Sequence, residues 1–221
     1  MGIRALSRTS DLAGVNPCFR DLAVTSKPRN HLAEQIQARP LRISYGISDE
    51  GEIMKISLDR LLGHMAWANQ KTIEHLQTLP EESLKAFATN PEWFVGEIVH
   101  HIVDSADHYA FRISGKPALT QPGDPCIDDV NVIADLARLK EQAATVDAML
   151  LECLTLDDVQ IEFVNFEDKL VKRWRSTILS QAIHHATEHR AQIASALEAK
   201  GFTPVNLDDF DIWAYEKSTE R

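Results

Sequence analysis

The chain has 221 residues, of which 44% are hydrophobic and 25% are charged, and its formal net charge is −10. This composition excludes a fibrous or wholly disordered chain, and the acidic balance disfavours nucleic acid as a partner because its phosphates are also negative. No apolar run approaches the roughly 18 residues that cross a bilayer, and the three cysteines contain no CxxC pair, so we expect a cytoplasmic protein with no membrane partner.

The first 53 residues differ from the rest of the chain. They carry seven basic and six acidic side chains, whereas residues 54–221 carry sixteen and twenty-seven. Pro17, Pro28 and Pro40 interrupt any helix there, the apolar residues have no sustained period, and no stretch resembles a secretory signal. We therefore predict a poorly ordered extension at 1–53 and a single helical domain at 54–221.

Two hypotheses account for this extension. Residues 1–53 are either a genuine flexible tail or the artefact of a misassigned start site, with Met54 as the natural first residue. Met54 leads directly into a helical pattern, and Glu50–Ile53 can be encoded by a purine-rich run that resembles a bacterial ribosome-binding site. The nucleotide sequence decides between the two hypotheses.

Two helices are predicted in the first half of the domain. The first begins after Ser57 as N-cap and ends before Pro80. Its apolar residues at helical spacing are Leu58, Leu61, Leu62, Met65, Ile73 and Leu76. The second runs from Pro91 to Ser114 and is ended by Gly115 and Pro117. Its inward face consists of Val95, Ile98, Ile102, Tyr109 and Ile113.

The second half of the domain contains two more predicted helices with a hairpin between them. After a loop at Thr120–Pro125, a third helix spans about Asp128–Cys153. Its apolar stripe consists of Val132, Leu136, Leu139, Ala143, Val146 and Leu150. Val159–Arg175 reads as a short β-hairpin, and a fourth helix covers about Ser176–Lys200. An aromatic tail is expected to pack back on the core through Phe210, Ile212, Trp213 and Tyr215. The predicted class is all-α.

Two histidines of the fourth predicted helix lie on one face. At about 100° per residue, His185 and His189 fall within or beside the apolar arc of this helix, whereas His184 points away from it. Because they are four residues apart, their imidazoles lie on neighbouring turns and can offer two nitrogens to one metal ion.

The second predicted helix offers one further candidate ligand. His101 lies at the edge of its apolar arc, while His100 faces away and His108 is a reserve candidate on the same stripe as His101. In the first helix, His64 and His75 lie off the core stripe and are expected in solvent. The sequence therefore predicts a divalent metal site formed by three residues, namely His101, His185 and His189.

Two alternatives compete with this interpretation. An inward histidine is more often a hydrogen-bonded core residue than a ligand, so an interaction bundle without metal stays open, although two imidazoles on a core face are unfavourable unless something binds both. Residues 185–189 also spell HxxEH, a pattern of some metallopeptidases. Such sites need an acidic ligand well downstream, and only thirty-two residues follow His189, so a protease is disfavoured and Glu188 is expected at the surface or beside a ligand.

Three segments in order resemble the DinB/YfiT-like proteins. They are LGHMAWANQK at Leu62–Lys71, EIVHHIVDSA at Glu97–Ala106 and HATEHRAQI at His185–Ile193. The resemblance covers about Met54 to Tyr215 and implies a four-helix bundle whose metal ligands align with His101, His185 and His189. Family members commonly carry HHRGQI where this chain has Glu188 and Ala191, but neither departure removes a ligand. The resemblance also implies a homodimer, to which Trp67–Asn69 of the first helix is expected to contribute.

The function expected from such a site is metal-dependent chemistry. Three imidazoles leave at least one coordination position open, and nitrogen donors suit Zn, Ni, Fe or Mn without choosing among them. We predict a hydrolase, or a transferase that uses a low-molecular-weight thiol, since the wider superfamily that the chain resembles includes thiol-dependent enzymes. Asp104, Glu188 and Arg190 are candidate helpers because they lie close to the ligands in sequence. The alternative function is a non-catalytic, metal-stabilised stress-response or interaction module.

Overall fold

The computed structural model of the chain describes residues 58–116, 119, 129–165 and 167–219. The chain divides into two units, Met1–Met54 and Lys55–Arg221, and all described residues belong to the second. The extension predicted at 1–53, the predicted N-cap Ser57 and the loop predicted at Thr120–Pro125 lie outside the described residues.

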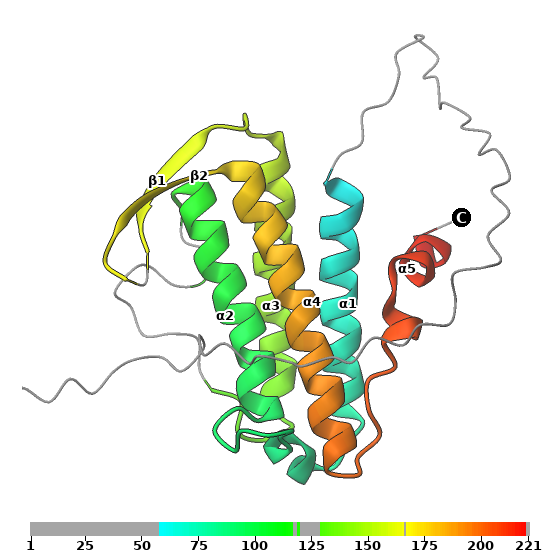
Figure 1. Ribbon diagram of the computed structural model, residues 1–221. Helices are drawn as coiled ribbons and strands as arrows, with labels where there is room; N and C mark the ends of the chain where they lie inside the picture. The colour runs from blue at the N-terminus through cyan, green and yellow to red at the C-terminus, as the bar shows by residue number, and fades with distance from the viewer. Residues whose placement is uncertain (1–57, 117–118, 120–128, 166, 220–221) are drawn as a thin grey trace, which may run out of the picture. The chain divides into compact units, whose positions relative to one another are not determined.

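Four long helices form the body of the second unit. They are α1 (Asp59–Gln77), α2 (Val95–Ser114), α3 (Asp135–Glu152) and α4 (Arg175–Ala199). In Figure 1, α2 and α3 run in one direction and α1 and α4 in the other. Both α1 and α2 pack against α3 and α4. Helices α2 and α4 are therefore neighbours, although His101 and His185 are 84 positions apart in the sequence.

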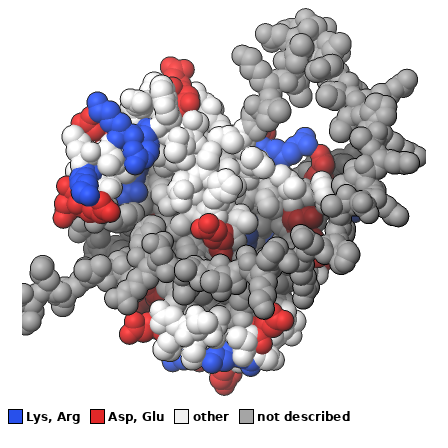
Figure 2. Space-filling model, viewed as in Figure 1, with Lys and Arg blue, Asp and Glu red and all other residues white. Residues whose placement is uncertain are grey.

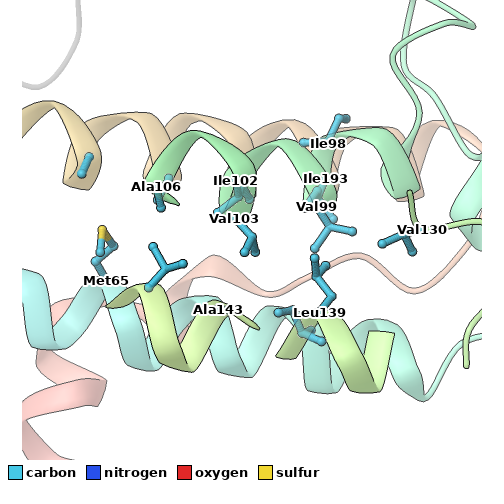
Figure 3. Packing of buried hydrophobic residues seen from close by; sticks show 14 of the residues in the cluster. Met65, Ile98, Val99, Ile102, Val103, Ala106, Val130, Leu139, Ala143 and Ile193 are labelled. Atoms are coloured by element: carbon cyan, nitrogen blue, oxygen red, sulfur yellow. The ribbon is translucent and has the colours of Figure 1, made fainter. Parts of the chain in front are cut away.

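The core of the bundle is aliphatic and draws on all four helices. Its largest fully buried side chains include Leu62, Met65, Ile98, Leu139, Leu150, Ile193 and Leu197. Figure 3 shows Ile102 and Val103 of α2 facing the helices that carry Met65 and Ala143. Removing such side chains from water contributes about 25 cal/mol per Å² of apolar surface, which makes the shared core the main force that holds α2 against α4.

A two-stranded antiparallel hairpin, β1 (Gln160–Val164) and β2 (Leu170–Trp174), lies between α3 and α4 in the chain. A lone hairpin is marginally stable, and here the half-buried Ile161 and Phe163 pack against the core cluster. The predicted all-α four-helix bundle with a hairpin between the third and fourth helices is confirmed.

The charged side chains of this hairpin are of both signs. Figure 2 shows Lys and Arg beside Asp and Glu over the hairpin, next to a largely uncharged helical surface. Lys172 pairs with Glu162 at 2.9 Å, and Lys169 pairs with Glu167 at 2.6 Å. These exposed pairs offset the basic cluster at 169–175 and weaken its field for a phosphate backbone.

Two helices begin later than predicted, each because a polar side chain stabilises a turn instead. Before α2, the Asn90 side chain accepts from Glu92 N at 3.0 Å and its carbonyl accepts from Trp93 N at 3.0 Å, so α2 begins at Val95 rather than at Pro91. Before α3, the Asp135 carboxylate accepts from Asn131 N and Val132 N at 2.9 and 3.0 Å.

The second of these turns also corrects the inward stripe predicted for the third helix. Because α3 begins at Asp135, Val132 precedes it and is 37% exposed, and Val130 is buried in the core instead. The remaining predicted members of the stripe, from Leu136 to Leu150, lie in α3 as expected. Short 3-10 helices occur at η1 (Glu81–Lys85), η2 (Cys153–Thr155) and η3 (Leu207–Phe210).

The C-terminal segment folds back on α1, ending in α5 (Ile212–Thr219). The ring of Trp67 lies 6.2 Å from that of Phe210 and 5.7 Å from that of Tyr215, and the Tyr215 hydroxyl occupies the space that a Cβ on Gly63 would need. The predicted packing of the aromatic tail on the core is confirmed for Phe210, whereas Tyr215 packs on Trp67 of α1. The prediction is wrong for Trp213, which is 72% exposed.

This fold-back also corrects the prediction for the histidines of the first helix. His64 and His75 are half-buried, with Nε2 atoms 2.8 Å from the Phe210 carbonyl and 3.0 Å from the Thr203 carbonyl. Residues 203–215 cover both histidines, and no apolar periodicity in that segment predicts this contact. Ala68 is buried within the bundle, which limits what this part of α1 can offer to another chain, and the predicted homodimer stays a prediction.

Candidate metal centre

Three imidazoles from α2 and α4 converge at one point of the bundle. His185 Nε2 lies 3.1 Å from His101 Nε2 and 3.0 Å from His189 Nε2. The ligand nitrogens of all three lie within 4.8 Å of one another. The structure thus brings together the three histidines that the helical wheel selects, while their role as metal ligands stays a prediction.

The spacings around His185 Nε2 are compatible with one shared divalent cation. His185 Nε2 takes part in both close contacts. If it carries a proton, that proton can point at His101 or at His189 but not at both. If it carries none, its single lone pair faces both neighbours. No assignment turns both contacts into good hydrogen bonds with neutral rings. Ligand bonds of about 2.0–2.1 Å place two nitrogens of a tetrahedral site about 3.3 Å apart, which is close to both observed spacings.

Burial keeps the three rings neutral, which is the form that binds a metal. Burial lowers the pKa of His101 to about 4, helped by the charge of His189. It lowers the pKa of His185 to about 3, with further contributions from His189 and His101. Burial also lowers the pKa of His189, opposed by Gln192 and by the charge of Glu188. At neutral pH each ring therefore has a free lone pair.

Two side chains close over one side of the site. The Trp93 ring stands edge-on to His101 and His189, with centroids 5.2 and 5.5 Å away. The Gln192 side-chain oxygen lies 2.8 Å from Trp93 Nε1 and 2.8 Å from His189 Nδ1. The turn that delays the start of α2 is what places Trp93 here.

Two residues of α2 border the other ligands. The Ser105 hydroxyl lies beside His101, 3.3 Å from Nε2 and 3.5 Å from Nδ1. The Tyr109 ring stands edge-on to His185 at 5.8 Å. A hydroxyl next to the ligand nitrogen is within reach of a molecule that shares the site.

The remaining histidines near the centre stay out of it. His184 is exposed, as predicted, and the half-buried His108 donates from Nδ1 to the Asp104 carbonyl at 2.8 Å. His100 was expected to face away, but it is buried, at 8% exposure. The reason is that α2 contacts α3 and η1 as well as α4, so more of its surface is covered than one apolar stripe indicates.

The three predicted helpers have different environments. Arg190 is buried and donates to Asn69 Oδ1 at 2.8 Å and to Thr187 Oγ1 at 3.0 Å, which makes it part of the interior and not of the site. Glu188 is exposed and acts on His189 through its charge. Asp104 has a buried Oδ1 with no hydrogen-bond partner among the described residues, and its Oδ2 lies 3.7 Å from His108 Nδ1.

The composition of the ligand cluster bears on the HxxEH pattern at residues 185–189. A metallopeptidase of that type needs an acidic ligand in addition to the two histidines. Within the described part of the chain, the ligand cluster contains three histidines and no carboxylate. The geometry is that of a three-imidazole site.

Sequence reasoning missed Trp93, Ser105 and Gln192 as neighbours of the ligands. Two of them had a signal, because Ser105 lies four residues after His101 and Gln192 three residues after His189, on the same helix faces. Trp93 had no such signal, because it lies in a turn that the prediction included in the second helix.

Comparisons with known proteins agree with this architecture. The chain matches the family model described as "DinB family" over residues 54–220. No protein of curated function matches the sequence. The matched range contains all four bundle helices, the hairpin and the three converging histidines.

Proposed function

Because this chain belongs to the DinB family over residues 54–220, we propose that it binds one divalent metal ion through His101, His185 and His189. The observation that carries the proposal is the approach of three neutral Nε2 atoms to 3.0 and 3.1 Å across two helices. The convergence of such nitrogens without a proton arrangement that satisfies them supports a cation as the missing partner.

The donor set limits the metal. Imidazole nitrogens suit Zn, Ni, Fe or Mn, and three ligands leave at least one position for a substrate. A bound ion supplies a Lewis acid that acidifies water or a thiol. Three neutral ligands leave its double positive charge uncompensated, and this charge favours an anionic group such as a thiolate at the open position.

We propose that the protein is a metal-dependent enzyme, either a hydrolase or a transferase acting with a low-molecular-weight thiol. Ser105 is placed to hydrogen-bond a substrate beside His101, and the rings of Trp93 and Tyr109 give the site apolar walls. The thiol-dependent reaction is the better supported of the two, because a thiolate needs no carboxylate base once it is formed and none joins the ligand cluster among the described residues.

A second candidate function is a metal-stabilised module without catalysis. It is favoured by the position of the ligands on two neighbouring helices, where a shared ion would tie α2 to α4. Binding to the folded state alone stabilises a protein by mass action. This function predicts metal-dependent stability without turnover.

One experiment separates the two candidates. Purified protein is loaded in turn with Zn, Ni, Fe and Mn and assayed with thiol and ester substrates beside the variants His185→Ala and His184→Ala. Turnover that is lost in His185→Ala and kept in His184→Ala supports the enzyme. Stoichiometric metal with no turnover in any loaded form supports the stabilised module, and no stoichiometric metal at all contradicts both.

We further propose that the protein works in a reducing compartment. Cys153 is buried with a free thiol, and burial raises the pKa of this thiol, so it is poorly reactive. No helix of the described ranges is long and apolar enough to span a bilayer. Fractionation of the native host tests the cytoplasmic location.

A further inference from the structure

We infer that Gln192 is a positioning residue that holds His189 in the tautomer protonated on Nδ1, so that the Nε2 lone pair faces the other two histidines. This inference rests on the proposed metal binding, because its consequence is a preorganised ligand. It concerns an outer contact, since the Gln192 side chain meets His189 at Nδ1 and not at the Nε2 that faces the other two histidines.

Trp93 determines which end of the Gln192 amide faces the site. An indole nitrogen is a donor and never an acceptor. The atom of Gln192 that lies 2.8 Å from Trp93 Nε1 must therefore be the carbonyl oxygen, because the amide NH₂ would bring two donors together. The orientation of this amide, which is ordinarily ambiguous, is thus fixed by its partner.

The same oxygen then determines the proton on His189. It lies 2.8 Å from His189 Nδ1, and two lone pairs facing each other at this distance would repel. Nδ1 must carry the hydrogen and donate it, which leaves Nε2 unprotonated. That nitrogen is the one 3.0 Å from His185 Nε2, on the side where a metal would bind.

The arrangement follows from local structure on two elements. Gln192 lies three residues after His189 on α4, which brings their side chains together along one face of the helix. Trp93 reaches the same oxygen from the turn before α2, and its ring packs edge-on against His189 at 5.5 Å. Ligating histidines generally donate their second nitrogen to an acceptor, and the loss of that acceptor weakens metal binding 10- to 100-fold.

Four variants test the inference. Gln192→Leu removes the acceptor at similar volume, Gln192→Glu keeps an acceptor, and Trp93→Phe removes the indole donor but keeps an aromatic ring. Gln181→Leu, at an exposed position of the same helix, is the matched control. The measurements are the ring-nitrogen NMR signals of His189 in metal-free protein, which distinguish the two tautomers, and the affinity for Zn²⁺ alone.

We expect Gln192→Leu to populate the Nε2-protonated tautomer and to bind Zn²⁺ about tenfold more weakly, the lower end of the usual range because water reaches this exposed position. Trp93→Phe should give a mixture of tautomers, Gln192→Glu should keep the wild-type tautomer and affinity, and the control should change neither.

An unchanged tautomer in Gln192→Leu overturns the inference, and so does an affinity loss in Gln192→Glu as large as that in Gln192→Leu. If the wild type bound no metal, the proposed function would fail, while the tautomer in metal-free protein would still decide this inference.

Discussion

Arg190, the residue after His189, donates from its guanidinium to the side-chain oxygen of Asn69 on α1 at 2.8 Å. Asn69 in turn donates to Asp147 Oδ2 on α3 at 3.5 Å. All three side chains are buried, so this polar chain links α4, α1 and α3 through the middle of an otherwise aliphatic core. It also fixes the turn of α4 that carries a proposed ligand.

The buried hydrogen-bonded series of Arg190, Asn69 and Asp147 predicts a pH dependence of stability. Burial raises the pKa of Asp147 from 3.8 to about 7, opposed by Asn69 and by the charge of Arg190. The native carboxyl thus holds its proton more tightly than the unfolded one, so its contribution to stability is full below about pH 4 and is lost as the pH rises to about 7. Asp147→Asn resembles the protonated carboxyl and does not titrate.

We therefore expect the free energy of unfolding of Asp147→Asn, relative to wild type, to increase between pH 4 and 7 and to level off above, with a slope of at most about 1.4 kcal/mol per pH unit. Urea unfolding of both proteins across this range is the measurement. A difference that stays flat between pH 4 and 7, with a slope of the opposite sign only below about pH 4, would show that Asp147 is ionised and paired with Arg190. Because the prediction concerns the difference in free energy of unfolding between the variant and wild type, titrating groups that both proteins share cancel.

Removal of the metal should lower stability. A ligand present at 100 times its dissociation constant stabilises the folded state by about 2.7 kcal/mol. We expect a chelator to lower the melting temperature of metal-loaded wild type and to leave that of His101→Ala unchanged, since that variant lacks the α2 ligand. An equal effect of the chelator on both proteins would indicate a binding site elsewhere.

Trp93 should report metal binding directly. Its ring centroid lies 5.2 Å from that of His101, and an open-shell ion such as Cu²⁺ or Ni²⁺ quenches indole emission at such short range. Saturating Ni²⁺ should quench part of the wild-type fluorescence. The quenching should be largely lost in Trp93→Phe and kept in Trp213→Phe, because Trp213 is an exposed residue of α5. Equal quenching in both variants would place the ion away from Trp93.

The parts of this structure that repeat with the helical period could be predicted from the sequence. The period indicated all four bundle helices. The spacing of His185 and His189, together with the position of His101, selected three rings whose ligand nitrogens lie within 4.8 Å of one another. These predictions succeed because a helix of known pitch fixes which side chains share a face.

The parts that failed depend on contacts between distant segments or on local turns. Arg190 looked like a helper beside a ligand, but one step along a helix turns a side chain by about 100°, and Asn69 on α1 receives it in the core. His64 was predicted to be exposed, but the segment around Phe210 packs over it. Trp93 was assigned to a helix, although the bonds to Asn90 favour a turn. Asn69 and Phe210 are far in sequence from the residues they contact, and Asn90 lies just before the apolar pattern of the second helix and is not part of it.

The close approach of α5 to α1 gives a last prediction. A Cβ added at Gly63 would collide with the Tyr215 hydroxyl and come within 3.2 Å of its ring carbon Cζ. Overpacking of this kind typically destabilises by about 1–3 kcal/mol, so Gly63→Ala should lower the free energy of unfolding or loosen the C-terminal segment. Tyr215→Phe removes the colliding oxygen but keeps the ring that packs on Trp67.

In Gly63→Ala combined with Tyr215→Phe, most of the lost stability should return. Urea unfolding of the two single variants and the double variant measures this coupling. Purely additive effects would mean that α5 does not rest on Gly63 in solution. Hydrogen exchange of residues 212–219 gives an independent readout, because their protection should fall in Gly63→Ala and recover in the double variant.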